Sequence, residues 1–463
     1  MSDCHTRLPF RFGASTMRQA PLCLLRAEIE TDAGVKAVGF SSDLLVPKWF
    51  DKNPDTTTRH DLDNLLNSVR QAAAAASDPY MTPGTVFQLW RRVYQTCAGV
   101  HGAPLVNGFG AALIERAVID AACRAADQPF FDALKTDLFG FEPGAMLAEL
   151  AGWNPSETLP AAPSETVKVR HTIGLLDALR AGDLAPADRV NDGLPQSLEE
   201  DIERYKLDHF KIKLSGDAEF DTQRVIRIAE ILQSAVSGPP RITLDGNEQF
   251  DTLDDLTATL ARVAKSAAGR ALLDGLLYIE QPLPRRHTFD PRRNAAMKSL
   301  EAFAAALIDE ADADLHAFKR AVELGYRGVS VKNCKGVFRA LLNFGLCAQS
   351  GGELFQSSED LTNLPVVALQ QDLATVAALG LTHAERNGHH YFAGLAHLPD
   401  SEVRAAAESH PDLYETRDEA VSLKIHDGAL SIGSLQCPGY GYAVPIDVIQ
   451  RTPLAHWRYP EAE

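Results

Sequence analysis

The sequence has few of the features that mark membrane-spanning or disulfide-linked proteins. No apolar run approaches the roughly 20 residues that a membrane-spanning helix needs. The seven cysteines are scattered, odd in number and without a CxxC pair, which argues against a zinc ribbon and is typical of reduced cytoplasmic thiols. The first residues lack the basic and then apolar layout of a secretory signal. We therefore expect a cytoplasmic protein with no membrane partner.

Positive charge is also scarce. Lys and Arg total 45 against 62 Asp and Glu, which gives a formal net charge of −17. An acidic surface repels the phosphate backbone, and no clustered basic run offsets it, so we expect no nucleic-acid partner. The hydrophobic fraction of 45% and the charged fraction of 23% are typical of a globular enzyme, and 463 residues correspond to two or three domains.

The first part of the chain predicts an α+β unit. Residues 22–30 and 35–40 have the pattern of a β-hairpin, and residues 60–76 and 110–126 have helical spacing of apolar positions. Residues 154–164 are rich in Pro, Ser and Glu and form a plausible linker. We expect a capping domain over 1–160, a barrel over 161–395 and a C-terminal segment over 396–463. A hairpin-like stretch at 420–432 could pair back onto the first domain.

From about residue 167, short apolar runs alternate with helical stretches. Eight runs are expected to be strands: 167–173, 209–214, 241–245, 276–280, 306–309, 328–332, 353–356 and about 378–382. Repeated strand–helix units of this size form a parallel sheet, and eight of them close into a barrel. Ser197 with Glu200 also fits a capping box at the start of a helix that ends near residue 207.

Charged residues stand at the ends of five consecutive predicted strands. In order along the chain they are Lys211 and Lys213, then Asp245, then Glu280, then Asp309, then Lys332. Barrel active sites lie at the carboxyl ends of the strands, and neighbouring strands are about 4.8 Å apart. The three carboxylates would therefore stand side by side with lysines on both flanks. Because adjacent carboxylates repel one another unless a cation lies between them, this all-oxygen set favours Mg2+, with Mn2+ as the second choice.

The flanking lysines then acquire a chemical role. A lysine beside a divalent cation and a second lysine is pushed towards its neutral, basic form. The ion can neutralise a substrate carboxylate and stabilise the dianion that remains when a proton leaves the α-carbon. Two lysines on opposite sides allow proton removal from one face and return to the other. They equally allow a one-base elimination in which the second lysine gives electrostatic support.

These residues make the chain resemble the enolase superfamily, and within it the subgroup of muconate lactonizing enzymes, whose members use Lys bases with Mg2+. The resemblance implies a (β/α)7β TIM-like barrel with an N-terminal α+β capping domain that the C-terminal segment completes. It implies a homo-oligomer, and a cap whose residues near 13–19 and 41–56 close over the substrate. It implies Mg2+ ligation by Asp245, Glu280 and Asp309, acid/base roles for Lys213 and Lys332, and support of the substrate carboxylate by Lys211. Asn247 and Glu310 would lie around the metal ligands or the substrate.

Two segments depart from the pattern of the subgroup. The chain has extra length before residue 110 and between 174 and 208. The predicted eighth strand is followed by His383 and Glu385, which we expect at the barrel mouth. His383 is a candidate substrate contact, and Glu385 could hold an ammonium group, as an acidic pair does in related amino-acid-derivative epimerases. The neighbouring His389 and His390 are expected to be loop residues, because adjacent residues on a strand point in opposite directions.

We therefore predict an Mg2+-dependent enzyme that removes the proton α to the carboxylate of a small-molecule substrate. Racemisation or epimerisation is favoured over cycloisomerisation or dehydration, because lysines occupy both sides. Two other classes stay open. A Schiff-base aldolase also places Lys inside a barrel but does not need the three carboxylates. The other is a non-catalytic barrel that has kept the metal site and only binds a ligand such as a sugar or an amino acid.

Overall fold

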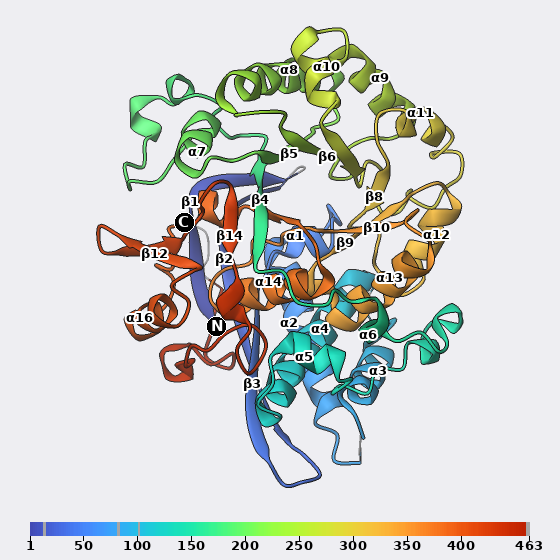
Figure 1. Cartoon of the computed structure of the whole chain (residues 1–463), viewed down its shortest axis with the longest axis vertical. Coiled ribbons are helices and arrows are strands. Elements are labelled where there is room, and N and C mark those ends of the chain that lie inside the picture. The colour runs from blue at the N-terminus through green and yellow to red at the C-terminus, as the bar shows by residue number, and fades with distance from the viewer. Residues whose placement is uncertain (13–14, 81–83, 101, 460–463) are drawn as a thin grey trace.

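A computed structural model describes residues 1–12, 15–80, 84–100 and 102–459 (Figure 1). Its central element is a closed barrel of eight parallel strands. These are β4 (Thr166–Ile173), β5 (His209–Lys213), β6 (Arg241–Asp245), β7 (Leu276–Glu280), β8 (Ala306–Ile308), β9 (Gly328–Val331), β10 (Phe355–Ser358) and β11 (His383–Arg386). They follow one another around the barrel in chain order, and parallel pairing of β11 with β4 closes it. The predicted barrel is therefore confirmed.

Helices connect the strands and lie outside the barrel (Figure 1). They are α7 (Leu198–Tyr205), α8 (Ala218–Ala235), α9 (Leu253–Val263), α10 (Ala267–Leu273), α11 (Met297–Glu301), α12 (Ala317–Glu323), α13 (Val337–Gln349) and α14 (Val367–Leu379). Alternation along each strand decides which residues face them. On β5, Phe210 and Ile212 belong to the large apolar core that includes helix residues such as Ile228, whereas Lys211 points into the barrel. The predicted capping box of Ser197 is present at the start of α7.

The last two strands lie later in the chain than predicted. β10 is displaced by two residues from the predicted 353–356, and the predicted strand at 378–382 is wrong because α14 continues to Leu379. Every residue of α14 is buried. A helix that is buried on all sides has no amphipathic period, so its apolar end at 376–379 resembles a buried strand. Gly380, with a φ of 69°, ends the helix in the left-handed region, and β11 begins at His383.

The N-terminal cap combines a three-stranded antiparallel sheet with helices. The sheet consists of β1 (Ser2–Phe12), β2 (Ser15–Glu30) and β3 (Lys36–Leu44), and the helices are α1 (Pro47–Phe50), α2 (Thr58–Ala76), α3 (Val86–Cys97), α4 (Pro104–Ala125), α5 (Phe130–Lys135) and α6 (Pro155–Thr158). The predicted hairpin and both predicted helices are confirmed. Of the segment expected to close as a loop, residues 15–19 belong to β2, and residues 13 and 14 lie outside the described residues. A buried ion pair between Arg116 of α4 and Asp43 of β3 joins the two layers.

The C-terminal segment contacts both parts of the chain. After α15 (Gly388–Tyr391) and α16 (Asp400–Ser409), β12 (Tyr414–Arg417) pairs with β13 (Ala420–Leu423), and β14 (Ala429–Ser431) pairs antiparallel with β4. Within the stretch 420–432, β13 thus pairs with β12 and β14 joins the barrel, so the predicted pairing with the first domain is wrong. Later residues return to the cap, where Trp457 Nε1 donates to Asp3 (3.0 Å) and Tyr442 OH to Asp120 (2.5 Å). Within the described ranges, no helix has both the length and the apolarity to cross a membrane.

Candidate active site

One pocket lies between the cap and the carboxyl ends of the barrel strands. The cap contributes apolar side chains to it: Phe10, Met17, Val46 and Trp49. The barrel contributes mainly polar ones, among them Lys213, Asn247, Asp309, Lys332, Asp360 and Glu385. A polar floor under an apolar roof fixes the orientation of a small molecule and excludes water from it.

The two lysines of the pocket stand on opposite sides of the barrel. Lys213 ends β5, and Lys332 directly follows β9, which is four strands further around a barrel of eight. The residues at the ends of the intervening strands are in register, with Lys213 opposite Asp245 and Asp245 opposite Glu280. Asp309 directly follows β8. The three predicted metal ligands therefore line the arc between the two lysines.

Each of these carboxylates contacts a lysine. The Asp245 Oδ2 atom is 2.5 Å from Lys213 Nζ, and the Asp309 Oδ2 atom is 2.6 Å from Lys332 Nζ. Lys211 Nζ is 2.8 Å from Glu280 Oε2 and 3.1 Å from Asp245 Oδ2. All six side chains are buried. The lysines are therefore the counter-charges of the carboxylates in this structure.

The charge on Glu280 is the least compensated. Burial and the neighbouring charges of Asp245 and Glu359 raise its pKa well above the usual value, although Lys211 opposes them. Lys211 Nζ contacts both oxygens of Glu280, Oε1 at 2.9 Å and Oε2 at 2.8 Å, but this one ammonium group is shared with Asp245, Glu359 and Glu385. Burial also acts to raise the pKa of Asp309, but Lys332 and Lys335 outweigh it and hold that pKa far below its usual range. A buried carboxylate that shares one ammonium group with several other carboxylates fits a hard divalent cation.

The arrangement also differs from the one expected around a bound ion. The carboxylate oxygens turn towards the lysines, and this trio is not among the described groups whose ligand atoms all lie within 4.8 Å of one another. Burial acts to lower the pKa of Lys332, but Asp309 outweighs it and raises that pKa above its usual value. The predicted neutral lysine therefore depends on the carboxylates being engaged by a cation instead.

Lys211 lies at the centre of the charge network and does not line the pocket. Its ammonium group donates to Glu280 (2.9 Å), Glu359 (2.8 Å) and Glu385 (2.9 Å). Glu359 in turn accepts from Arg170 (2.5 Å) and from Tyr278 OH (2.6 Å). The sequence reasoning missed Glu359, although its position directly after the seventh strand, as found in the structure, is the signal that identifies the other site residues.

Glu385 reaches the pocket, but three donors already hold its carboxylate. Thr172 Oγ1 donates to Oε1 (2.6 Å), while Lys211 Nζ and the Asp360 backbone N–H (2.7 Å) donate to Oε2. This environment suits an internal counter-charge better than a free ammonium ligand. The prediction that places His383 at the barrel mouth is wrong, because β11 begins with this residue. Its ring is therefore near the other end of the barrel, where Nδ1 is 2.5 Å from Arg170 Nη1.

Several neighbours orient the predicted metal ligands. The Asn247 N–H donates to Asp245 Oδ1 (2.7 Å), and its side-chain amide donates to Glu310 Oε1 (3.2 Å). Gln281 Oε1 accepts from the Asp309 N–H (2.9 Å), which fixes the turn that follows β8. Asn247 and Gln281 have φ values of 43° and 34°, a conformation that is costly for residues with side chains and that accumulates at functional sites.

The cap also contacts a candidate acid/base residue. Trp49 of α1 lies within the range 41–56 that the resemblance assigns to substrate closure, and Lys332 Nζ is 4.4 Å from the centre of its ring. A cation over an indole face is stabilised electrostatically. Sequence reasoning named the segment but not this residue.

Comparisons with known proteins show similarity in structure alone. No family model and no curated protein matches the sequence. Among solved structures, 2-chloromuconate cycloisomerase from Rhodococcus opacus is 16% identical, with 96% of this chain and 95% of that chain covered and a TM-score of 0.62. N-succinyl Arg/Lys racemase from Bacillus cereus is 14% identical (96% and 93% covered, TM-score 0.61). Dipeptide epimerase from Enterococcus faecalis is 15% identical (95% and 96% covered, TM-score 0.58). The chain therefore shares its capped-barrel fold with a cycloisomerase, a racemase and an epimerase.

Proposed function

We propose that the protein is an Mg2+-dependent enzyme that removes the proton α to a substrate carboxylate, and that the reaction is a racemisation or epimerisation. One observation carries the proposal. Lys213 and Lys332 extend from opposite strands of the barrel into the same pocket. Two amines that face one α-carbon from opposite sides can act on both of its faces.

Asp245, Glu280 and Asp309 would hold the ion. When bound, Mg2+ supplies the positive charge that neutralises a substrate carboxylate and stabilises the dianion formed by proton loss. Glu280 supports this assignment, because burial and neighbouring carboxylates outweigh Lys211 and raise its pKa. The dipeptide epimerase from Enterococcus faecalis, which shares the fold, was crystallised with Mg and the dipeptide L-Leu-L-Tyr.

Side chains of the protein would transfer the protons, position the metal ligands and exclude water. For one enantiomer, Lys213 accepts the α-proton on its side of the pocket and Lys332 donates a proton on the other side; for the opposite enantiomer the roles are exchanged. Asn247 and Gln281 hold the turns that carry Asp245 and Asp309. Trp49 and the other apolar cap residues exclude water, so that the protons pass between substrate and lysines.

A one-base cycloisomerisation or elimination is the second candidate. The position of Lys332 over the Trp49 ring, together with its raised pKa, favours a lysine that stays charged and acts electrostatically. Lys213 would then be the base. The cycloisomerase from Rhodococcus opacus is among the proteins that share the fold.

Deuterium exchange tests the proposal and separates the two candidates. The protein with Mg2+ in D2O is screened against amino-acid derivatives, dipeptides and sugar acids, and α-deuteration is followed by NMR. In a two-base reaction, Lys213→Ala loses exchange with one enantiomer and Lys332→Ala with the other. In a one-base reaction, Lys213→Ala loses all exchange. No α-deuteration of any bound carboxylate would contradict both candidates, and borohydride trapping that is insensitive to EDTA would indicate the aldolase.

A further inference from the structure

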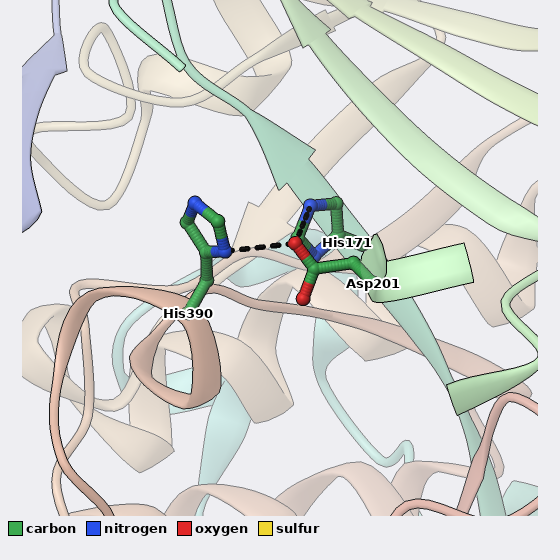
Figure 2. Close-up of side chains that lie close together, drawn as sticks. All are labelled: His171, Asp201 and His390. Atoms are coloured by element: carbon green, nitrogen blue, oxygen red, sulfur yellow. Dashed lines mark ion pairs between the residues drawn. The ribbon is translucent and has the colours of Figure 1, made fainter. Parts of the chain in front are cut away.

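A second buried cluster of potential ligands lies on the outer side of the barrel wall. It consists of His171 of β4, Asp201 of α7 and His390 of α15, and Figure 2 shows the two imidazoles around the carboxylate. One ligand atom from each residue lies within 4.8 Å of the other two. The neighbouring residues Arg170 and Thr172 reach partners inside the barrel, so the alternation of β4 directs His171 outwards, away from the pocket.

The cluster is tightly spaced but poorly hydrogen-bonded. Asp201 Oδ2 is 2.8 Å from His390 Nδ1 and 3.7 Å from His171 Nε2. None of the three residues is more than 1% exposed. The contact between His390 Nδ1 and Asp201 Oδ2 is an ion pair, whereas Asp201 Oδ1 and His390 Nε2 make no hydrogen bond among the described residues. Buried polar atoms without hydrogen bonds are costly, so these atoms point to a ligand.

His389 fixes the orientation of His171. Its Nε2 atom is 3.0 Å from His171 Nδ1, which leaves His171 Nε2 directed at Asp201. In metal sites, the ring nitrogen that does not bind the ion is typically held in this way by a neighbouring group. His389 and His390 were expected to be loop residues. They instead lie on the short helix α15, and they contact different members of the cluster.

We propose that His171, Asp201 and His390 bind a divalent transition-metal ion, with zinc as the best match. Two imidazoles and one carboxylate are common zinc ligands, and a water molecule would complete the tetrahedron. Bonds of about 2.0–2.2 Å place tetrahedral ligand atoms about 3.4 Å apart, between the two separations observed here. The all-oxygen set of the pocket prefers Mg2+, so the two sites would select different ions.

The ion would join three segments of the wall. His171 belongs to the barrel, Asp201 to the insertion between 174 and 208, and His390 to α15, which directly follows the pocket residues Glu385 of β11 and Asn387. A second pocket, lined in part by Tyr205, reaches His389, the residue that contacts His171. The inferred role is to hold the pocket wall in place, and it does not depend on the reaction proposed above.

Metal titration of the full chain tests the site. Protein stripped of metal and then saturated with Mg2+ is titrated with Zn2+, and separately with Co2+. We expect one tightly bound Zn2+ per chain, a rise in Tm, and the intense visible absorption of tetrahedral Co2+. His171→Gln and His390→Gln should each weaken binding at least 100-fold, and His389→Gln about 10- to 100-fold. His397→Gln, which changes a half-buried histidine bonded to the Pro365 carbonyl, should bind as the wild type does.

Two results would overturn the proposal. One is the absence of tight Zn2+ binding by the wild type. The other is binding that His171→Gln and His390→Gln retain. Either would show that the cluster is only a buried ion pair of Asp201 with His390. If a glutamine variant fails to fold, the near-isosteric Asp201→Asn replaces it. The Co2+ spectrum of the wild type tests the site without any variant, because an octahedral spectrum, or no spectrum, contradicts a tetrahedral site. Asp245→Asn should leave Zn2+ binding unchanged, which separates this site from the pocket.

Discussion

Strand β4 separates two buried polar clusters that have different chemistry. On its inner face, Thr172 contacts a network in which one ammonium group, that of Lys211, donates to three carboxylates. On its outer face, His171 contacts a single carboxylate and two other imidazoles. The two residues are adjacent in the sequence, and the alternation of side chains along the strand places them in separate environments.

The two clusters differ in what remains uncompensated. In the inner cluster, lysines accompany the carboxylates, and the main excess is negative charge at Glu280. In the outer cluster, the atoms without a hydrogen bond include His390 Nε2 and Asp201 Oδ1. Carboxylate oxygens prefer a hard cation, and in the inner cluster such an ion would lie beside groups that can transfer protons. Imidazole nitrogens prefer a transition metal, and in the outer cluster that ion would have a structural role. The comparison predicts that damage to one cluster has only a small effect on the function of the other.

The largest effect is expected when the lysines of the inner cluster are removed. Lys213→Ala and Lys332→Ala should each lower turnover about 10²- to 10⁴-fold, because each removes a group that transfers a proton. Initial rates with the substrate found in the deuterium screen measure this. Lys168→Met is the matched control, because Lys168 lies near the other end of β4 and pairs with Asp208. Turnover that survives in both alanine variants would contradict the assignment.

The second prediction compares two carboxylates of the same arc. Glu280→Gln should lower Mg2+-dependent turnover at least 100-fold, yet the metal-free protein should be no less stable, because burial and like charges already disfavour ionised Glu280. Asp309→Asn should also lower turnover, but it leaves Lys332 and Lys335 without their shared partner. Breaking such a buried pair costs about 3–5 kcal/mol.

Thermal unfolding in EDTA distinguishes these two variants. A clearly lower Tm for Asp309→Asn alone supports the charge balance described here. An equal loss in both variants would show that Glu280 is fully compensated without a metal, and the argument for a cation at this arc would lose its main support.

Much of the inner cluster was predictable from the sequence, and the outer cluster was not. In a parallel barrel, chain order is spatial order, so a charged residue at each strand end predicts a ring of charges. The positions of Lys213, Asp245 and Glu280 followed from that rule. The prediction of the strand positions failed for β10, which lies two residues later than expected, and for β11. The apolar end of α14 was mistaken for the eighth strand, so His383 was misplaced.

The outer cluster had no comparable signature. His171, Asp201 and His390 come from three segments separated by long intervals, and only the packing of α7 and α15 against β4 brings them together. Sequence spacing indicates metal ligands when they share a helix, a strand or a short loop. It gives no information when each ligand belongs to a different element.

The third prediction concerns the pH dependence of stability and His383, the first residue of β11. Burial, followed by the charge of Arg170, lowers the pKa of His383 to about 2. The folded-state pKa is thus below the unfolded value of about 6.5. Below that pH the unfolded chain binds a proton at His383 that the folded protein does not bind. Stability is fully present above about pH 6.5 and falls as the pH drops below it, by up to about 1.4 kcal/mol per pH unit.

His383→Gln should flatten this dependence. Urea unfolding of both proteins between pH 5 and pH 7 measures the difference, with pH values chosen on both sides of about 6.5. His426→Gln is the control, because His426 is 83% exposed and should not alter the slope. An unchanged slope in His383→Gln would mean that the contact of His383 with Arg170 does not depend on a neutral ring.

The smallest effect is expected for Thr172→Val, and it tests the separation of the two clusters most directly. Thr172 is fully buried and donates to Glu385 Oε1 at 2.6 Å, so the valine removes one hydrogen bond to a charged group without changing the volume much. Such a bond contributes about 1.5 kcal/mol, which corresponds to a roughly tenfold decrease in turnover if it holds Glu385 and Lys211 in place. Zn2+ affinity should not change, because the adjacent His171 faces the other way. In His171→Gln the pattern should be reversed, with Zn2+ binding lost and α-deuteration reduced only a few-fold. If each variant instead impaired both properties equally, β4 would transmit the damage through its backbone, and the two clusters would have to be treated as one site.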